Sequence, residues 1–396
     1  MKNRMMKTIV AMAMVLVLTM MCIPMVSAID YGGDCGEGLE WRYTEETGEL
    51  KIEGNGSMPE YEYREVPWID FVDDIIKVTV CEGVEYVSDE AFSCLESLEE
   101  ISLPSTVDGV SVGFIHNNNC KKITVAEGNQ YLSSDENGVL YDKNKTTLMI
   151  YPSGSETTEF TVPASVKEIS NEAFFCAYKL KSVTLPDGLI RIGERAFFKT
   201  ELLEKIEIPD SVIEIGHAAF EDSGIKSVKI SSSLTKLAAS VFASCVNLIE
   251  VTIPDSVKVI ENDVFWDCES LKTVAIPMSV THIDASAFED CAAEINYAGS
   301  QEDWNKIVIL DEDGVGKDVF NSLKVNYNVK TETQTTLAQT TEPASDDTTV
   351  QQNDGVDSKT VIIVAIIAVS VVVIIAIIAI IFVSKNKNKN KEYKTK

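Results

Sequence analysis

Short runs in which apolar and polar residues alternate recur along most of the chain. Val183 and Leu185 form one such run, and Val251 and Ile253 form another. A period of two predicts a short strand with one buried face. Most runs end at a proline, which cannot donate to the hydrogen-bond ladder of a sheet and therefore ends the strand. A second apolar group follows each run, so each unit contains a strand and a return segment.

The aromatic residues of these units are evenly spaced, at intervals of 23, 23, 22, 23 and 23 residues. They are Phe174, Phe197, Phe220, Phe242, Phe265 and Phe288. The units share the pattern Leu-x-x-Val-x-Ile-Pro-x-Ser-Val-x-x-Ile-x-x-x-Ala-Phe-x-x-Cys. One unit of this length cannot cover its own apolar face, so the units must stack. The sequence therefore predicts a β-rich α/β superhelix, a solenoid over residues 81–291 with these rings in its core.

The regular spacing fails between Pro104 and Val162. There the stretch GNQYLSSDENGVLYDKNKTTLMIYP alternates apolar and polar residues around two turn-rich segments. We predict a small hairpin over about residues 126–152, inserted into the solenoid, with a disordered loop as the alternative. We also expect that removing this segment would leave the buried anchors of the main repeat block in place.

Both ends of the repeat block differ from its middle. Residues 29–80 and 292–329 lack the repeat and are rich in Trp, Tyr and Gly. Because the terminal units of a solenoid need a polar outer face, we assign these segments as an N-terminal and a C-terminal cap.

Several stretches resemble one known family. The repeats with Ile-Pro-x-Ser-Val and Ala-Phe-x-x-Cys, the opening CGEGLEWRYTEETGELKIEGNGSMPEY, the inserted GNQYLSSDENGVLYDK and the ending YAGSQEDWNKIVI are similar to the BspA-like leucine-rich-repeat surface proteins. The resemblance covers about residues 35–329. It implies a leucine-rich-repeat solenoid with an extracellular, non-enzymatic recognition role, often described as adhesion, and it supplies no catalytic residues.

The N-terminus has the features of a secretory signal. Lys2, Arg4 and Lys7 precede an apolar run, and Val26-Ser27-Ala28 fits a small-residue cleavage site. We predict a signal peptide over residues 1–28, with a first membrane anchor as the alternative.

The C-terminal region predicts a single membrane span. Val361–Val383 holds 23 residues without a charge, about 34 Å of helix, so we assign residues 360–383 as a transmembrane helix. Six lysines follow in the tail 384–396, and positive charge marks the cytoplasmic side. The bulk of the chain is then extracellular. Residues 330–359 are rich in threonine and poor in apolar residues, which predicts a flexible stalk.

Charge and motifs exclude several classes of function. The chain holds 62 acidic and 34 basic residues, a net charge of -28, which argues against a nucleic-acid binder. It lacks Gly-x-Ser-x-Gly, His-Glu-x-x-His and phosphate-binding glycine motifs. The acidic run Asp311–Asp318 lacks the spacing of an EF-hand loop, which favours a solvated turn. We predict no catalytic residue, no cofactor and no metal site.

Cysteines also follow the repeat. Cys245, Cys268 and Cys291 each lie three residues after a repeated phenylalanine, which predicts a column of buried apolar thiols. Disulfides between successive coils are an alternative, because coil spacing permits them. A bridge between Cys35 and Cys81 at the N-terminal cap is a further alternative in an extracellular setting.

The outward positions of the repeated strands are the candidate binding residues. They are small or polar, of mixed charge, and suit broad recognition of an extracellular protein or glycan. We predict this surface to comprise Ser182, Thr184, Lys205, Glu207, Ser227, Lys229, Glu250, Thr252 and Thr273. The predicted function is that of a membrane-anchored recognition or adhesion protein. The alternative is a structural envelope protein that shields the membrane and has no specific ligand.

Overall fold

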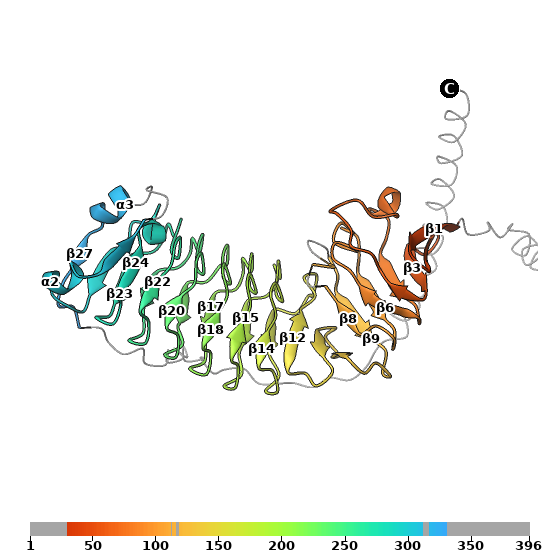
Figure 1. Cartoon of the computed structure of the whole chain (residues 1–396), viewed down its shortest axis with the longest axis horizontal. Coiled ribbons are helices and arrows are strands. Elements are labelled where there is room, and N and C mark those ends of the chain that lie inside the picture. Colours follow the sequence, from red (N-terminus) through yellow and green to blue (C-terminus); the bar gives the residue numbers. More distant parts are fainter. Residues whose placement is uncertain (1–29, 112, 116–118, 312–316, 331–396) are drawn as a thin grey trace, which may run out of the picture. The chain divides into compact units, whose positions relative to one another are not determined.

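Figure 1 shows a computed structural model of the chain, which describes residues 30–330 apart from 112, 116–118 and 312–316. The predicted signal peptide, almost all of the stalk, the predicted transmembrane helix and the basic tail lie outside the described residues. Within the described part, no helix combines the length and the apolar character that a membrane crossing requires.

The N-terminal part of the solenoid begins with an antiparallel meander and continues in parallel. Its first sheet has the order β1 (Asp30–Gly36), β2 (Leu39–Thr44), β3 (Glu49–Gly54), β5 (Lys77–Val80), β7 (Glu100–Leu103) and β9 (Lys122–Val125). A second ladder comprises β4 (Gly56–Ser57), β6 (Val84–Val87) and β8 (Gly109–Val110), and a 3-10 helix, η1, covers Ile69–Phe71. Strand β5 already pairs in parallel with β3 and β7, so the coils begin inside the segment that we assigned to the N-terminal cap.

The main repeat block forms a parallel sheet, as the alternation predicts (Figure 1). Its order is β13 (Glu159–Thr161), β15 (Ser182–Thr184), β17 (Lys205–Glu207), β19 (Ser227–Lys229), β21 (Glu250–Thr252), β23 (Thr273–Ile276), β25 (Glu294–Tyr297) and β27 (Val325–Asn326). Strands β25 and β27 extend this sheet into the segment assigned to the C-terminal cap. The remaining elements there are the helices α2 (Gln301–Trp304) and α3 (Lys317–Ser322) and the strand β26 (Val308–Leu310), which belongs to a return ladder.

The return segments of the coils form two further ladders. The first has the order β10 (Leu132–Ser134), β11 (Leu140–Asp142), β12 (Thr147–Ile150), β14 (Glu168–Ile169), β16 (Arg191–Ile192) and β18 (Glu214–Ile215). The second comprises β20 (Lys236–Leu237), β22 (Val259–Ile260), β24 (His282–Asp284) and β26 (Val308–Leu310), with the 3-10 helix η2 (Ala285–Phe288) after β24. The break between β18 and β20 falls in the coil where Ser231 replaces the repeated proline. Its hydroxyl donates to the Val212 carbonyl at 2.7 Å.

The repeated phenylalanines form one continuous stack, which confirms their predicted place in the core. All six side chains from Phe174 to Phe288 are fully buried. Successive ring centroids are 4.7, 5.1, 5.7, 6.0 and 5.5 Å apart, with planes within 21° of parallel. Each interior ring therefore loses its exposed surface to a neighbour on both sides.

Two residues in left-handed backbone conformation flank the anchor ring in most coils. Around Phe197 they are Arg195, with φ at 49°, and Lys199, with φ at 56°; around Phe265 they are Asp263 and Asp267. These turns aim the anchor's amide along the solenoid axis, and the Phe197 N–H donates to the carbonyl of Ala219 in the next coil at 2.7 Å. Left-handed backbone costs a non-glycine residue about 1–2 kcal/mol, so the stacking of the coils offsets a repeated local strain.

The inserted segment is part of the solenoid wall. Strands β10 and β11 pair antiparallel, but β12 pairs in parallel with β14 and so occupies a regular coil position. Tyr141, Leu148 and Tyr151 are buried, and the Tyr151 ring lies 5.0 Å from the ring of Phe174. The expectation that the segment can be removed without loss from the repeat core is therefore wrong, because its apolar side chains complete that core.

Cys245 and Cys268 are fully buried, which confirms two members of the predicted thiol column, whereas Cys291 is only partly buried. Cys35 and Cys81 form no disulfide with each other in this structure. The Cys245 thiol donates to the Phe220 carbonyl at 3.1 Å, and the Cys268 thiol donates to the Phe242 carbonyl at 3.2 Å. These thiols satisfy backbone carbonyls of the preceding coil.

We expect these thiols to resist alkylation in the folded protein. Burial raises the pKa of Cys35, Cys120 and Cys245 to about 12, so almost no reactive thiolate exists at pH 8. Iodoacetamide followed by peptide mass spectrometry should label these positions only after denaturation in guanidinium. Rapid labelling of native Cys245 would contradict its buried placement.

Candidate functional site

The outward residues of β15 to β23 lie in two rows across neighbouring coils, and we call them the strand-lined face. Register pairs Ser182 with Lys205, Lys205 with Ser227, Ser227 with Glu250, and Glu250 with Thr273. The second row comprises Thr184, Glu207, Lys229 and Thr252. The structure thus brings all nine predicted residues onto one surface, because each central strand residue, such as Val228, points into the core.

Some of the charged residues on this face form ion pairs, either with each other or with a neighbouring residue. The Lys205 ammonium lies 2.6 Å from the Glu207 carboxylate on the same strand, and Lys229 lies 3.5 Å from Asp210. The backbone N–H of Ser232, together with Lys229, lowers the pKa of Asp210 below its usual value, so this carboxylate stays charged at neutral pH. The face therefore presents ion pairs and hydroxyl groups side by side.

A hollow of about 600 Å³ lies on the strand-lined face between β15 and β19. Five of the nine predicted residues line it: Ser182, Thr184, Lys205, Glu207 and Lys229. Its walls offer ammonium, carboxylate and hydroxyl groups together, which suits a polar ligand surface.

A third row, which alternation alone does not reveal, precedes the strands. This pre-strand row comprises Lys181, Glu204, Lys226, Ile249 and Lys272, each directly before a strand of the main sheet. The Lys226 ammonium lies 2.9 Å from the Glu204 carboxylate and lowers the pKa of that carboxyl group. The signal in the sequence is the same interval of 22 or 23 residues that spaces the phenylalanines.

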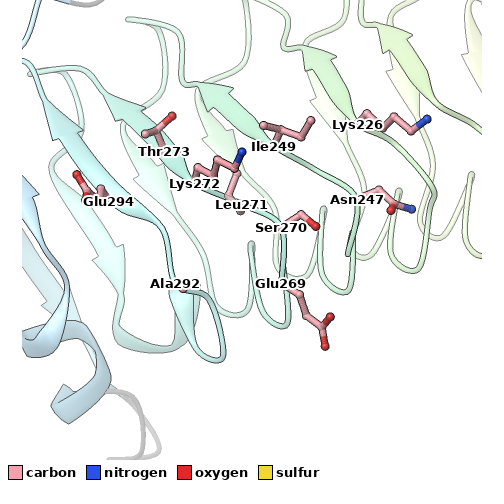
Figure 2. A pocket seen from close by; sticks show the side chains of 10 residues that line it. All are labelled: Lys226, Asn247, Ile249, Glu269, Ser270, Leu271, Lys272, Thr273, Ala292 and Glu294. Carbon is pink, nitrogen blue, oxygen red and sulfur yellow. The ribbon is translucent and has the colours of Figure 1, made fainter.

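A second hollow, of about 840 Å³, lies at the C-terminal end of the pre-strand row. Figure 2 shows Ile249 between Lys226 on one side and Lys272 on the other, with Asn247 and Ser270 on the loops below. Ile249 keeps 44% of its surface exposed.

The described residues contain no group of three or more His, Cys, Asp or Glu side chains placed to hold a metal ion. Most of the acidic run Asp311–Asp318 lies outside the described residues. What the site offers chemically is reversible ion pairing, hydrogen bonding and contact with one exposed aliphatic side chain.

Comparison with solved structures finds several bacterial repeat proteins. A leucine-rich-repeat protein from Eubacterium ventriosum is 22% identical with a TM-score of 0.48, over 79% of this chain and 98% of that one. A leucine-rich cell-surface protein from Faecalibacterium prausnitzii is 29% identical with a TM-score of 0.44, and the match covers 60% of this chain and 64% of that one. The pneumococcal vaccine antigen PcpA is 20% identical with a TM-score of 0.43, over 61% and 68%.

The comparison with curated proteins finds no significant match. The model of the BspA type leucine-rich-repeat region matches in six copies, over residues 71–160 and 167–295. These ranges include the strand-lined face, the phenylalanine stack and both hollows described above. The chain belongs to the BspA-type leucine-rich-repeat family.

Proposed function

We propose that the chain is a membrane-anchored cell-surface recognition protein whose strand-lined face binds an extracellular protein or glycan. The observation that supports this proposal is that the face repeats in register over five strands and that none of its nine residues is buried. Such an array offers many weak polar contacts, which together give affinity when a broad partner engages several coils. The proposal assigns recognition, including adhesion, and no catalysis to this surface.

A four-residue variant of the strand-lined face tests the proposal. Replacing Lys205, Glu207, Lys229 and Glu250 by alanine removes charge but no buried anchor, so the fold should persist by circular dichroism. In a pull-down from extracellular matrix, mucin and neighbouring cells, we expect the variant to lose at least tenfold in retained partner. Retention that equals that of the unaltered chain would reject this face.

The inserted segment supplies the matched control. Deleting residues 128–152 would remove core residues, so the control instead replaces the exposed Tyr131, Glu136 and Asn144 by alanine. This variant should retain the partner normally. Loss of binding in this variant alone would move recognition to the inserted segment. If neither screen nor variant reveals a specific partner, the shielding role is favoured, which the net charge of -28 suits.

The proposed topology predicts which parts of the chain a protease reaches. Apolar residues 361–383 followed by six lysines support an external repeat domain and an internal tail. Protease added to intact cells should release a large soluble fragment and leave a C-terminal epitope tag protected. A repeat domain that resists protease until the cells are lysed would contradict this orientation.

A further inference from the structure

In two stretches of the solenoid, residues directly before the strands carry opposite charges in successive coils, whereas Ile76, Thr158 and Ala293 precede β5, β13 and β25. Before β7 and β9, Glu99 and Lys121 are paired at 2.6 Å. In the main block the pre-strand row gives Lys181, Glu204 and Lys226 in successive coils, and Glu204 pairs with Lys226 at 2.9 Å. The Glu204 carboxylate thus offsets part of the positive charge of the two lysines.

This alternation is interrupted at Ile249. Backbone hydrogen bonds from Ile249 to Lys226 and from Lys272 to Ile249, at 3.2 and 2.9 Å, hold the three residues in adjacent coils. Ile249 therefore lies between Lys226 and Lys272 in the row, as Glu204 lies between Lys181 and Lys226. Within the described part of the chain, Lys272 forms no ion pair, so its charge is available to a ligand.

The acidic residues around this hollow do not fill the gap. Glu294 pairs with Lys324 at 2.5 Å and accepts a hydrogen bond from Asn326, and the Lys324 ammonium lowers its pKa. The Glu269 side chain points away from the row in Figure 2. Ile249 thus lies between Lys226, which pairs with Glu204, and Lys272, and neither Glu269 nor Glu294 forms an ion pair with Lys272.

We propose that this hollow binds an acidic segment of a partner protein, with a carboxylate between Lys226 and Lys272 and a neighbouring aliphatic side chain on Ile249. The inference rests on the proposed function and names the partner chemistry for this end of the surface. A peptide fits better than a glycan, because none of the described lining residues is an aromatic ring on which a sugar would stack. The net charge of -28 also repels a long polyanion but tolerates one local carboxylate.

The test supplies the missing carboxylate from within the chain. Ile249→Glu should complete the alternation and occupy both lysines, and Lys272→Met should remove the free cation. The probe is a fluorescent Gly-Glu-Leu-Glu-Gly peptide, with Gly-Gln-Leu-Gln-Gly as its uncharged counterpart, measured by anisotropy on the full-length chain. We expect each variant to weaken binding of the acidic probe at least tenfold, and the uncharged probe to bind at least tenfold more weakly.

Lys258→Met is the matched control, since Lys258 is an exposed lysine that precedes β22 on another ladder and forms no ion pair with the residues that the structure describes. It should bind the probe within twofold of the unaltered chain, and all three variants should keep the native melting temperature or exceed it. Equal binding by the Ile249→Glu variant, or by the uncharged probe, would overturn the proposal. So would a uronate oligosaccharide that binds while the acidic peptide does not.

Failure here is distinguishable from failure of the proposed function. If Ile249→Glu keeps a partner that the four-residue variant loses, recognition by the strand-lined face stands and only this hollow is rejected. If neither change affects the partner, both are rejected.

Discussion

Replacing Phe242 by alanine is expected to lower the free energy of unfolding by about 3–5 kcal/mol. The ring is fully buried and lies between Phe220 at 5.7 Å and Phe265 at 6.0 Å, so its removal opens a cavity between two coils. Contacts in a solenoid are between neighbours, so amide exchange should accelerate mainly in the adjacent coils. Denaturant titration and hydrogen exchange measure the two effects.

Phe198→Ala is the control for this prediction. Phe198 is only half-buried, stacks on Phe175 at 5.1 Å, and lies beneath the side chains of Arg195 and Lys199. Its loss leaves a surface notch that water fills, so the destabilisation should be clearly smaller. An equal loss for both variants would contradict the buried cavity as the cause of the destabilisation.

Replacing Asn129 by alanine should destabilise the chain by roughly 4 kcal/mol, because it leaves three buried backbone groups and one partly buried group without this partner. The side chain is fully buried. Its amide nitrogen donates to the carbonyls of Pro104 and Val107, at 2.9 and 2.7 Å. Its oxygen accepts from the N–H groups of Tyr131 and Leu132, at 2.8 and 2.7 Å. Asn129 thus joins the inserted segment to the preceding coil.

The neighbouring Gln130 provides a control with the same functional group. It is exposed and donates only to the nearby Gly128 carbonyl, so Gln130→Ala should change the free energy of unfolding by less than about 0.5 kcal/mol. Thermal and denaturant unfolding of both variants gives the comparison. An Asn129→Ala variant as stable as the Gln130→Ala variant would disprove the anchoring role.

The main block was predictable because each coil repeats the same local pattern. A coil that departs from the pattern can therefore be interpreted from its neighbours. The Phe stack and the alternating strands follow directly from it. The short return strands, such as β16 with two residues, are too brief to show alternation. The role of Tyr141 and Tyr151 was missed because they reach the same core from a different spacing. Their burial depends on packing against Phe174, a contact between distant parts of the chain.

Part of the candidate surface was predictable from the sequence, and part was not. The nine outward residues were predictable because strand alternation decides which side chains face solvent. The pre-strand row was not predictable, because the exposure of Ile249 depends on the conformation of the turn that precedes the strand. The missing carboxylate between Lys226 and Lys272 becomes visible only when successive coils are laid side by side.

The apolar interior is divided in two at the inserted segment. One cluster includes Leu132, Leu140 and Ile150, and the other includes Tyr141 and the whole phenylalanine stack. Cooperativity in a solenoid passes only between adjacent units, so this seam limits how far a local loss of structure can propagate. The strands that carry the strand-lined face bury their central residues in the cluster that includes the phenylalanine stack. Fraying that starts at the N-terminal meander therefore has a place to stop before it reaches the surface on which recognition would depend.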